Sequence, residues 1–389
     1  MLGEFKKWWS LHRKNIALLL WGYFILQLLL YFPYFLPVEL LQSFRLDVTS
    51  PLAFLRFYDG PFYVGVAQTF YQFFPGMNNF YSHYGGIIYL TNHFPLFPLI
   101  IRGMSLVMPF SLAGLMANQI VSIAGIVVLY RVYLFFMNPR EALVVSFVQL
   151  LIPLRSLLWH HVANSEPTAL LFIAISILLI LKKKYWWGLL VAMLVQLTRP
   201  LMLIVFPGYF FVALLEEKGR IIKAFSTLVL PLTFIAVEWW FYVAVPDFSF
   251  TGRPGGFLSL LANSPFLNFF DQAFSADGIW YLFAGVFAGV FVLYEKGKSN
   301  RDYWRLGLLW GPFLFFTLFI RHHDVSRYLW PSLPFVMFIP LKDFFQNRAV
   351  QVAIIIMIPA LLLASWGVLS QNQMPVTHFI EWLRALGEY

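Results

Sequence analysis

The sequence predicts an all-α polytopic membrane protein, on the strength of its composition and the distribution of its charges. Of the 389 residues, 60% are hydrophobic and only 12% carry a charge. An average soluble domain has about 25% charged residues, so this chain lacks the charge to cover a water-exposed surface. Its net charge of +9 is spread between long apolar segments, which argues against nucleic-acid binding. The absence of cysteine excludes disulfides, thiol catalysis and cysteine-bound zinc.

Eleven apolar stretches are candidate spans, because about 20 apolar residues cross a bilayer and fewer suffice beside a protein-lined cavity. The first, residues 16–36, has no charge and no small-residue cleavage site, so we expect a signal anchor. The neighbours 185–198 and 201–215 either both cross or both fail to cross, which leaves nine spans as the alternative. The later candidates are 111–136, 142–158, 167–181, 185–198, 201–215, 224–245, 279–294, 306–320, 328–341 and a stretch beginning at 349.

Basic residues set the expected orientation, since Lys and Arg are retained on the cytoplasmic side of short loops. Lys6, Lys7, Arg13 and Lys14 place the N-terminus in the cytoplasm. The apolar parts of the first external loop then lie in the membrane interface as amphipathic or re-entrant helices. The expected single domain, residues 1–389, has a first span at 16–36, an external catalytic loop at 37–110, the remaining spans at 111–369 and an external tail at 370–389.

The outer face of this topology carries arginine and no lysine, because all 11 Lys fall inside. A guanidinium binds phosphate or carboxylate through two hydrogen bonds even where water is partly excluded, so these residues indicate an anionic ligand. Alternatively, the side chain of any one of these Arg residues simply extends from a helix end to the lipid headgroups. Ionisable side chains gather in external loops rather than along the spans, which favours chemistry at the outer face over a pore or pump. The outer arginines are Arg45, Arg56, Arg102, Arg155, Arg199, Arg253, Arg321, Arg327 and Arg384.

Asp59 is the most informative polar residue of the external loop. It stands in an Asp-Gly-Pro turn before residues 62–71, which can form a helix, so it is a candidate N-cap. A carboxylate among aromatic residues is also a candidate general base, because desolvation raises its pKa and a nearby Arg lowers it. Both roles stay open from the spacing alone.

Other external segments add polar residues. The proline-punctuated segment 92–102 carries His93 and Arg102, and either anchors the loop in the membrane or positions a lipid tail or a lipid phosphate. Glu166 stands in the first turn of a span, where the helix dipole favours a carboxylate and where it could hold an acceptor sugar or orient a base. Arg199 follows a short apolar stretch on the same side.

The densest external polar run is residues 321–328. Adjacent histidines with an aspartate could indicate a metal, but no helical His-x-x-x-His pair and no Cys accompany them. We therefore expect no metal, and expect Arg321 and Arg327 to bind phosphate or sugar.

Five of these segments, taken in order over about residues 55–335, resemble the PIG-V family of GPI mannosyltransferases, within the GT-C glycosyltransferase superfamily. Residues 57–63 look like its Trp-Asp-Gly-x-Trp-Tyr element, with Tyr58 in the place of the first Trp and Pro61 at a variable position. Residues 94–102 are similar to its Phe-Phe-Pro-Leu-Tyr-Pro-Leu-x-x-Arg element. The Tyr-Ser-Glu, Leu-Thr-Arg-Pro and Arg-Tyr-x-x-x-x-x-Pro elements are matched by residues 164–166, 197–200 and 327–334.

The resemblance implies a GT-C fold and transfer of a sugar, in that family mannose, from a polyprenyl (dolichyl-type) phosphate sugar to a glycolipid or glycan acceptor at the outer or lumenal face. It places Asp59 at the catalytic acidic position. We expect an inverting displacement without metal or other cofactor, in a prokaryotic plasma membrane, or in the ER membrane of a eukaryote. The donor phosphate is assigned first to Arg199 and Arg327 and then to Arg56 and Arg102. The acceptor or sugar is assigned to Glu166, His93, His322, His323, Asp324 and Tyr328.

Two other functions share much of this pattern. A related GT-C enzyme that glycosylates protein Ser/Thr or lipid A would have the same fold and the same Asp59. A lipid-linked sugar flippase without chemistry would instead show internal repeats and ionisable groups at the membrane midplane. No convincing repeat is present, which favours the enzyme.

Overall fold

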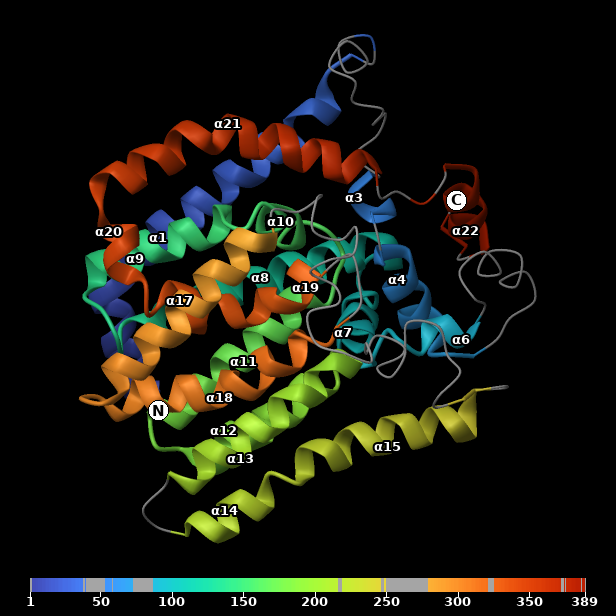
Figure 1. Ribbon diagram of the computed structural model, residues 1–389. Helices are drawn as coiled ribbons and strands as arrows, with labels where there is room; N and C mark the ends of the chain where they lie inside the picture. The colour runs from blue at the N-terminus through green and yellow to red at the C-terminus, as the bar shows by residue number, and fades with distance from the viewer. Residues whose placement is uncertain are drawn as a thin grey trace.

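The protein is helical throughout the part of the chain that the structure describes, with no strand in it. That structure, a computed structural model, describes residues 2–37, 39, 53–57, 59–72, 87–215, 219–245, 248–249, 279–320, 325–371, 374, 376–385 and 387–388. The long helices lie beside one another in a bundle, with shorter helices at one end (Figure 1). The all-α class expected for the chain is therefore found in the described residues.

The bundle helices differ widely in length. Four helical stretches are long and apolar enough to cross a membrane: Lys6–Phe35, Phe110–Tyr133, Arg220–Ala244 and Arg348–Ser370. Three shorter apolar stretches are Glu166–Leu181, Tyr185–Gln196 and Pro200–Leu214. The bundle comprises α1 (Leu2–Tyr31), α8 (Phe110–Tyr133), α9 (Pro139–Leu151), α11 (Glu166–Leu181), α12 (Tyr185–Gln196), α13 (Phe206–Leu214), α14 (Arg220–Ser226), α15 (Val229–Ala244), α17 (Ile279–Gly297), α18 (Arg301–Thr317) and α21 (Arg348–Gln371).

Short elements join and cover these helices. The stretch expected as one span over 142–158 is broken near Pro153, since a helix cannot continue normally through the residue before a proline. The stretch 328–341 is likewise a series of short turns rather than one α-helix. The short elements are η1 (Phe32–Phe35), α3 (Ala53–Arg56), α4 (Gly60–Thr69), α6 (Ile87–Leu90), α7 (Leu96–Met104), α10 (Arg155–Trp159), η3 (Pro200–Val205), α19 (Val325–Leu329), η6 (Trp330–Ser332), η7 (Pro334–Phe338), α20 (Lys342–Gln346) and α22 (Val376–Ala385).

Close backbone contact between bundle helices depends on glycine. In α13, a Cβ added at Gly208 would collide with the carbonyl oxygen of Leu309 in α18. A Cβ added at Gly311, which is also in α18, would instead have open space around it. The two helices therefore approach each other at Gly208 more closely than any side chain would allow.

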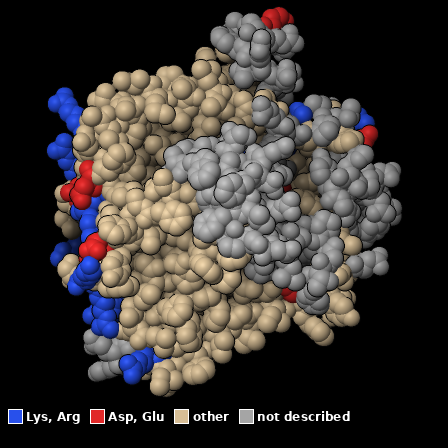
Figure 2. All heavy atoms as spheres, viewed as in Figure 1, with Lys and Arg blue, Asp and Glu red and all other residues tan. Residues whose placement is uncertain are grey.

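The two ends of the bundle differ in charge. Figure 2 shows Lys and Arg side chains along the edge of the molecule where Figure 1 places α14, α20 and the N-terminus. The broad middle of this face is almost free of charge where it is described. Helices α4, α6, α7 and α22 lie at the opposite end, so the external-loop residues expected to carry the chemistry are far from the basic edge.

A separate apolar cluster supports this opposite end. It packs α4 and α7 against the start of α8, against α15 and against the C-terminal helix α22. The C-terminal segment is held there by backbone bonds as well: Met374 N donates to the carbonyl oxygen of Arg56 at 2.9 Å, and Arg56 Nε donates to the carbonyl oxygen of Met374 at 2.8 Å. Helices α4 and α7 are thus held in place by apolar packing, and the neighbouring α3 is held by hydrogen bonds to the C-terminal segment.

Candidate active site

Asp59 lies at the start of α4, at the N-cap position that the sequence pattern predicts. Its side chain makes no capping hydrogen bond. Instead, Arg327 Nη2 in α19 donates to Asp59 Oδ2 at 2.6 Å. The helix start therefore positions the carboxylate, while the carboxylate itself faces a guanidinium 268 residues away in sequence.

Glu166 joins two arginines at the first turn of α11. Its Oε1 accepts hydrogen bonds from Arg199 Nη1, at 2.6 Å, and from Arg327 Nε. Asn164 Oδ1 accepts a further bond from Arg327 Nη2 at 3.1 Å. Arg327 thus links the carboxylates of Asp59 and Glu166, and its guanidinium plane is fixed by three acceptors. We call Asp59, Glu166, Arg199 and Arg327 the ion-paired cluster.

The ion-paired cluster is buried and formally neutral. Glu166 is 0% exposed and Asp59 is 9% exposed, and the two guanidiniums are also buried. Two carboxylates and two guanidiniums balance, as buried charges must to avoid a large desolvation cost. Burial alone would raise the pKa of Asp59, but the Arg327 charge, together with the nearby His93 ring, outweighs it and holds that pKa well below its usual range. Asp59 is therefore ionised at neutral pH.

Aromatic side chains enclose the acidic end of the cluster. His93 Nε2 lies 3.7 Å from Asp59 Oδ1, and the ring of Tyr63 meets the His93 ring edge-on at 4.7 Å between centroids. The Tyr63 hydroxyl lies 2.5 Å from Ser165 Oγ, which ties α4 to the start of α11. Sequence reasoning missed Tyr63 and Ser165 as site residues. The signal was available, because Tyr63 stands one helical turn after Asp59 on the same face.

Several polar atoms beside the cluster are buried without a hydrogen-bond partner in the described part of the chain. They are Glu166 Oε2, Asn164 Nδ2 and His93 Nδ1. Buried polar groups are normally paired, so unpaired ones beside four charges indicate a place for a polar ligand. The site offers this ligand both a donor, from the Asn164 amide, and an acceptor, from Glu166.

The remaining candidate residues separate into three groups. Tyr328 joins the site, because the Arg199 guanidinium lies over its ring at 5.4 Å from the centroid. Arg56 and Arg102 lie elsewhere: Arg56 binds the C-terminal segment, and Arg102 lies at the far ends of α4 and α7. Tyr58, His322, His323 and Asp324 lie outside the described residues.

No group of three or more His, Cys, Asp and Glu side chains that could hold a metal ion occurs within the described ranges. His160 and His161 form a different polar cluster, deeper in the bundle, where the ring of His161 stacks on Tyr23 at 4.8 Å.

Chemically, the ion-paired cluster combines an ionised carboxylate with two guanidiniums suited to phosphate. No protein-family model and no curated protein sequence matches this chain.

Proposed function

We propose that the protein is a membrane glycosyltransferase of the GT-C type that transfers a sugar, most simply mannose, from a polyprenyl phosphate sugar to a glycolipid or other acceptor. The observation that supports this most is the convergence of Asp59, Glu166, Arg199 and Arg327 in one buried cluster. These residues come from four segments that resemble motifs of one glycosyltransferase family. In this proposal the chain has 11 spans, or nine, with a cytoplasmic N-terminus and the cluster at the external face of a prokaryotic plasma membrane.

Arg199 and Arg327 bind the donor phosphate in this proposal. A guanidinium stabilises the charge that grows on the phosphate as the sugar leaves. Both arginines already bind Glu166 Oε1, so an incoming phosphate meets two guanidiniums that this carboxylate holds side by side, with donors left over for the phosphate oxygens. Glu166 then acts as the anchor that orients both arginines, and the unpaired Asn164 Nδ2 can donate to the sugar or the phosphate.

Asp59 acts as the general base. The acceptor hydroxyl oxygen attacks the anomeric carbon from the side opposite the phosphate, the carbon–oxygen bond to the phosphate breaks with its electron pair on the phosphate, and the hydroxyl proton passes to Asp59. A carboxylate with a lowered pKa can accept this proton because the attacking oxygen becomes strongly acidic once its new bond forms. A single displacement of this kind inverts the anomeric configuration, and no step requires a metal.

The test is sugar transfer by the Asp59→Asn variant in membranes, measured with a radiolabelled polyprenyl phosphate sugar. Asparagine keeps an oxygen for Arg327 but cannot take the proton, so we expect turnover to fall by about 10²–10⁴-fold. Asp343→Asn is the matched control, because Asp343 is an exposed aspartate of α20 at the basic edge. Near wild-type turnover of Asp59→Asn, with equal membrane insertion of both variants, would remove Asp59 from this role.

A further inference from the structure

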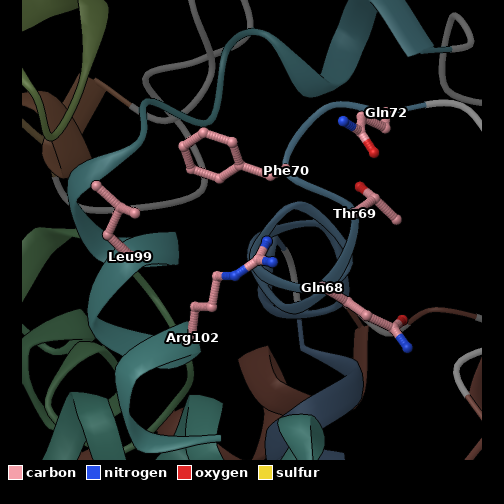
Figure 3. A pocket seen from close by; sticks show the side chains of 6 residues that line it. All are labelled: Gln68, Thr69, Phe70, Gln72, Leu99 and Arg102. Atoms are coloured by element: carbon pink, nitrogen blue, oxygen red, sulfur yellow. The ribbon is translucent and has the colours of Figure 1, made fainter.

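A pocket with both polar and apolar lining lies at the other end of the α4–α7 pair. It has a volume of about 330 Å³ and is lined by Gln68, Thr69, Phe70, Gln72, Leu99 and Arg102. Figure 3 shows the Arg102 guanidinium directed from α7 toward the end of α4, with Phe70 and Leu99 on one side and Thr69 and Gln72 on the other. We call this the Arg102 pocket.

Among the residues that the structure describes, Arg102 has no acidic partner in the Arg102 pocket. No carboxylate oxygen of the described residues lies within 4.0 Å of its guanidinium, and its hydrogen bond to the carbonyl oxygen of Ala67 is long, at 3.5 Å. The Phe70 ring lies 5.8 Å from the guanidinium carbon. Among the described residues, most of the donor capacity of this fork is therefore unused, and a phosphate is the anion whose geometry it fits best.

The Arg102 pocket is too far from Asp59 to hold the phosphate of the sugar donor. Helices α4 and α7 run in the same direction, since Tyr63 packs on Phe97 near their starts and Ala67 contacts Arg102 near their ends. Ala67 lies eight residues after Asp59, or about 12 Å along the helix. The reacting phosphate is bonded to the anomeric carbon, which must itself contact both the acceptor oxygen and the neighbourhood of Asp59. A phosphate at Arg102 therefore belongs to another molecule.

The surroundings of the pocket indicate a lipid. Helix α7 buries Phe97 and Ile101 while it leaves Leu99 44% exposed, and Leu106 and Val107, just beyond its end, are among the most exposed apolar side chains of the chain. This is the pattern of a helix that lies in the membrane interface. The long apolar helix α8 begins at Phe110, so Arg102 stands shortly before a membrane-spanning candidate.

We propose that the Arg102 pocket binds the phosphate group of an anionic membrane lipid, separately from the donor site. The Arg102 fork holds the phosphate, the Gln72 amide donates to its oxygens, the Thr69 hydroxyl, whose proton goes to the Gly65 carbonyl oxygen, accepts from a headgroup hydroxyl, and the acyl chains lie along Leu99. The carbonyl ends of α4 and α7 also face this region and disfavour an anion. Binding therefore depends on Arg102, which makes this residue the one to change.

The experiment is native mass spectrometry of the detergent-solubilised full chain titrated with phosphatidylglycerol, with phosphatidylcholine as the neutral lipid. We expect Arg102→Gln to weaken phosphatidylglycerol binding by roughly tenfold, as the loss of charged hydrogen bonds implies. Arg102→Lys keeps the charge, so its affinity for phosphatidylglycerol is expected to lie between that of the wild type and that of Arg102→Gln. Arg384→Gln, an exposed arginine of α22, is the matched control and is expected to bind like the wild type.

Three outcomes would overturn the proposal. They are equal phosphatidylglycerol affinity in Arg102→Gln and the wild type, an equal loss in Arg384→Gln, and wild-type binding of phosphatidylcholine as tight as that of phosphatidylglycerol. A further arm with soluble glycerol phosphate separates the two sources of phosphate, since competition at the lipid's own affinity would show a free-phosphate site instead. The Asp59→Asn variant is expected to keep full lipid binding. Lipid binding at Arg102 can therefore fail or succeed independently of the glycosyltransferase proposal.

Discussion

Replacing Glu166 by glutamine perturbs the ion-paired cluster at its centre. The side chain is fully buried, and one of its oxygens accepts hydrogen bonds from both Arg199 and Arg327. Glutamine keeps the size and one acceptor oxygen but removes the negative charge. The cluster then has two guanidiniums and a single carboxylate, so one positive charge is left buried without compensation.

The expected loss is large because neither arginine can reach water. Removing one partner of a buried ion pair costs about 3–5 kcal/mol, since the remaining charge stays desolvated. Solvent screening does not reduce this figure much, because the Arg199 and Arg327 side chains are only 9% and 5% exposed. For comparison, Asp343 in α20 forms an ion pair with Lys296 at 3.4 Å and its side chain is 76% exposed. Loss of that pair is expected to cost at most about 1 kcal/mol.

The measurement is reversible unfolding in mixed micelles, with the free energy of unfolding compared among the wild type, Glu166→Gln and Asp343→Asn. The double variant Glu166→Gln/Arg199→Gln restores neutrality, so we expect it to be less destabilised than the sum of its single variants. A Glu166→Gln protein within about 1 kcal/mol of the wild type would refute the reasoning, because it would mean that water or another anion compensates the arginines.

Two further predictions concern acid and packing. The lowered pKa of Asp59 means that its ionised form stabilises the folded chain above the unfolded-state pKa of about 4, and that this contribution is lost as the pH falls further through the folded-state pKa. The free-energy difference between the wild type and Asp59→Asn should therefore be constant above about pH 5 and shrink below about pH 4, and a change between about pH 6 and 8 would contradict this assignment. In the bundle, Gly208→Ala should destabilise by about 1–3 kcal/mol, because its Cβ collides with the Leu309 carbonyl oxygen. Gly367→Ala in α21, where an added Cβ has open space around it, should be neutral or stabilising by up to about 1 kcal/mol, and equal effects of the two substitutions in thermal unfolding would argue against the close contact.

The external-loop residues illustrate how far sequence reasoning reached. The Asp-Gly-Pro turn correctly predicted a helix that starts after Asp59, because capping and proline preferences act over only a few residues. The fate of the Asp59 side chain was not predictable in the same way. Its hydrogen-bond partner, Arg327, is 268 residues away in the sequence, and local residue preferences do not predict a contact over such a separation.

The outer arginines show the same limit. Their type and expected side of the membrane distinguished them from the lysines, and Arg199 and Arg327 were ranked ahead of Arg56 and Arg102, but the contacts of each were not predicted. In the folded chain Arg327 and Arg199 join Glu166, Arg56 binds the C-terminal segment, and Arg102 lies in its own pocket. Four residues with one predicted role thus occupy three different environments, because each environment is built by a different set of helices.

The sequence by itself determined that this is a helical, charge-poor chain with several apolar segments, and where the polar turns between them fall. Those properties depend on each segment's own residues and on their transfer from water to an apolar phase. Only the tertiary structure decided that α4, α11, α19 and the turn before η3 meet, and so which carboxylate pairs with which guanidinium. Buried charges require partners within hydrogen-bond distance, and in this protein the partners are supplied by parts of the chain that only folding brings together.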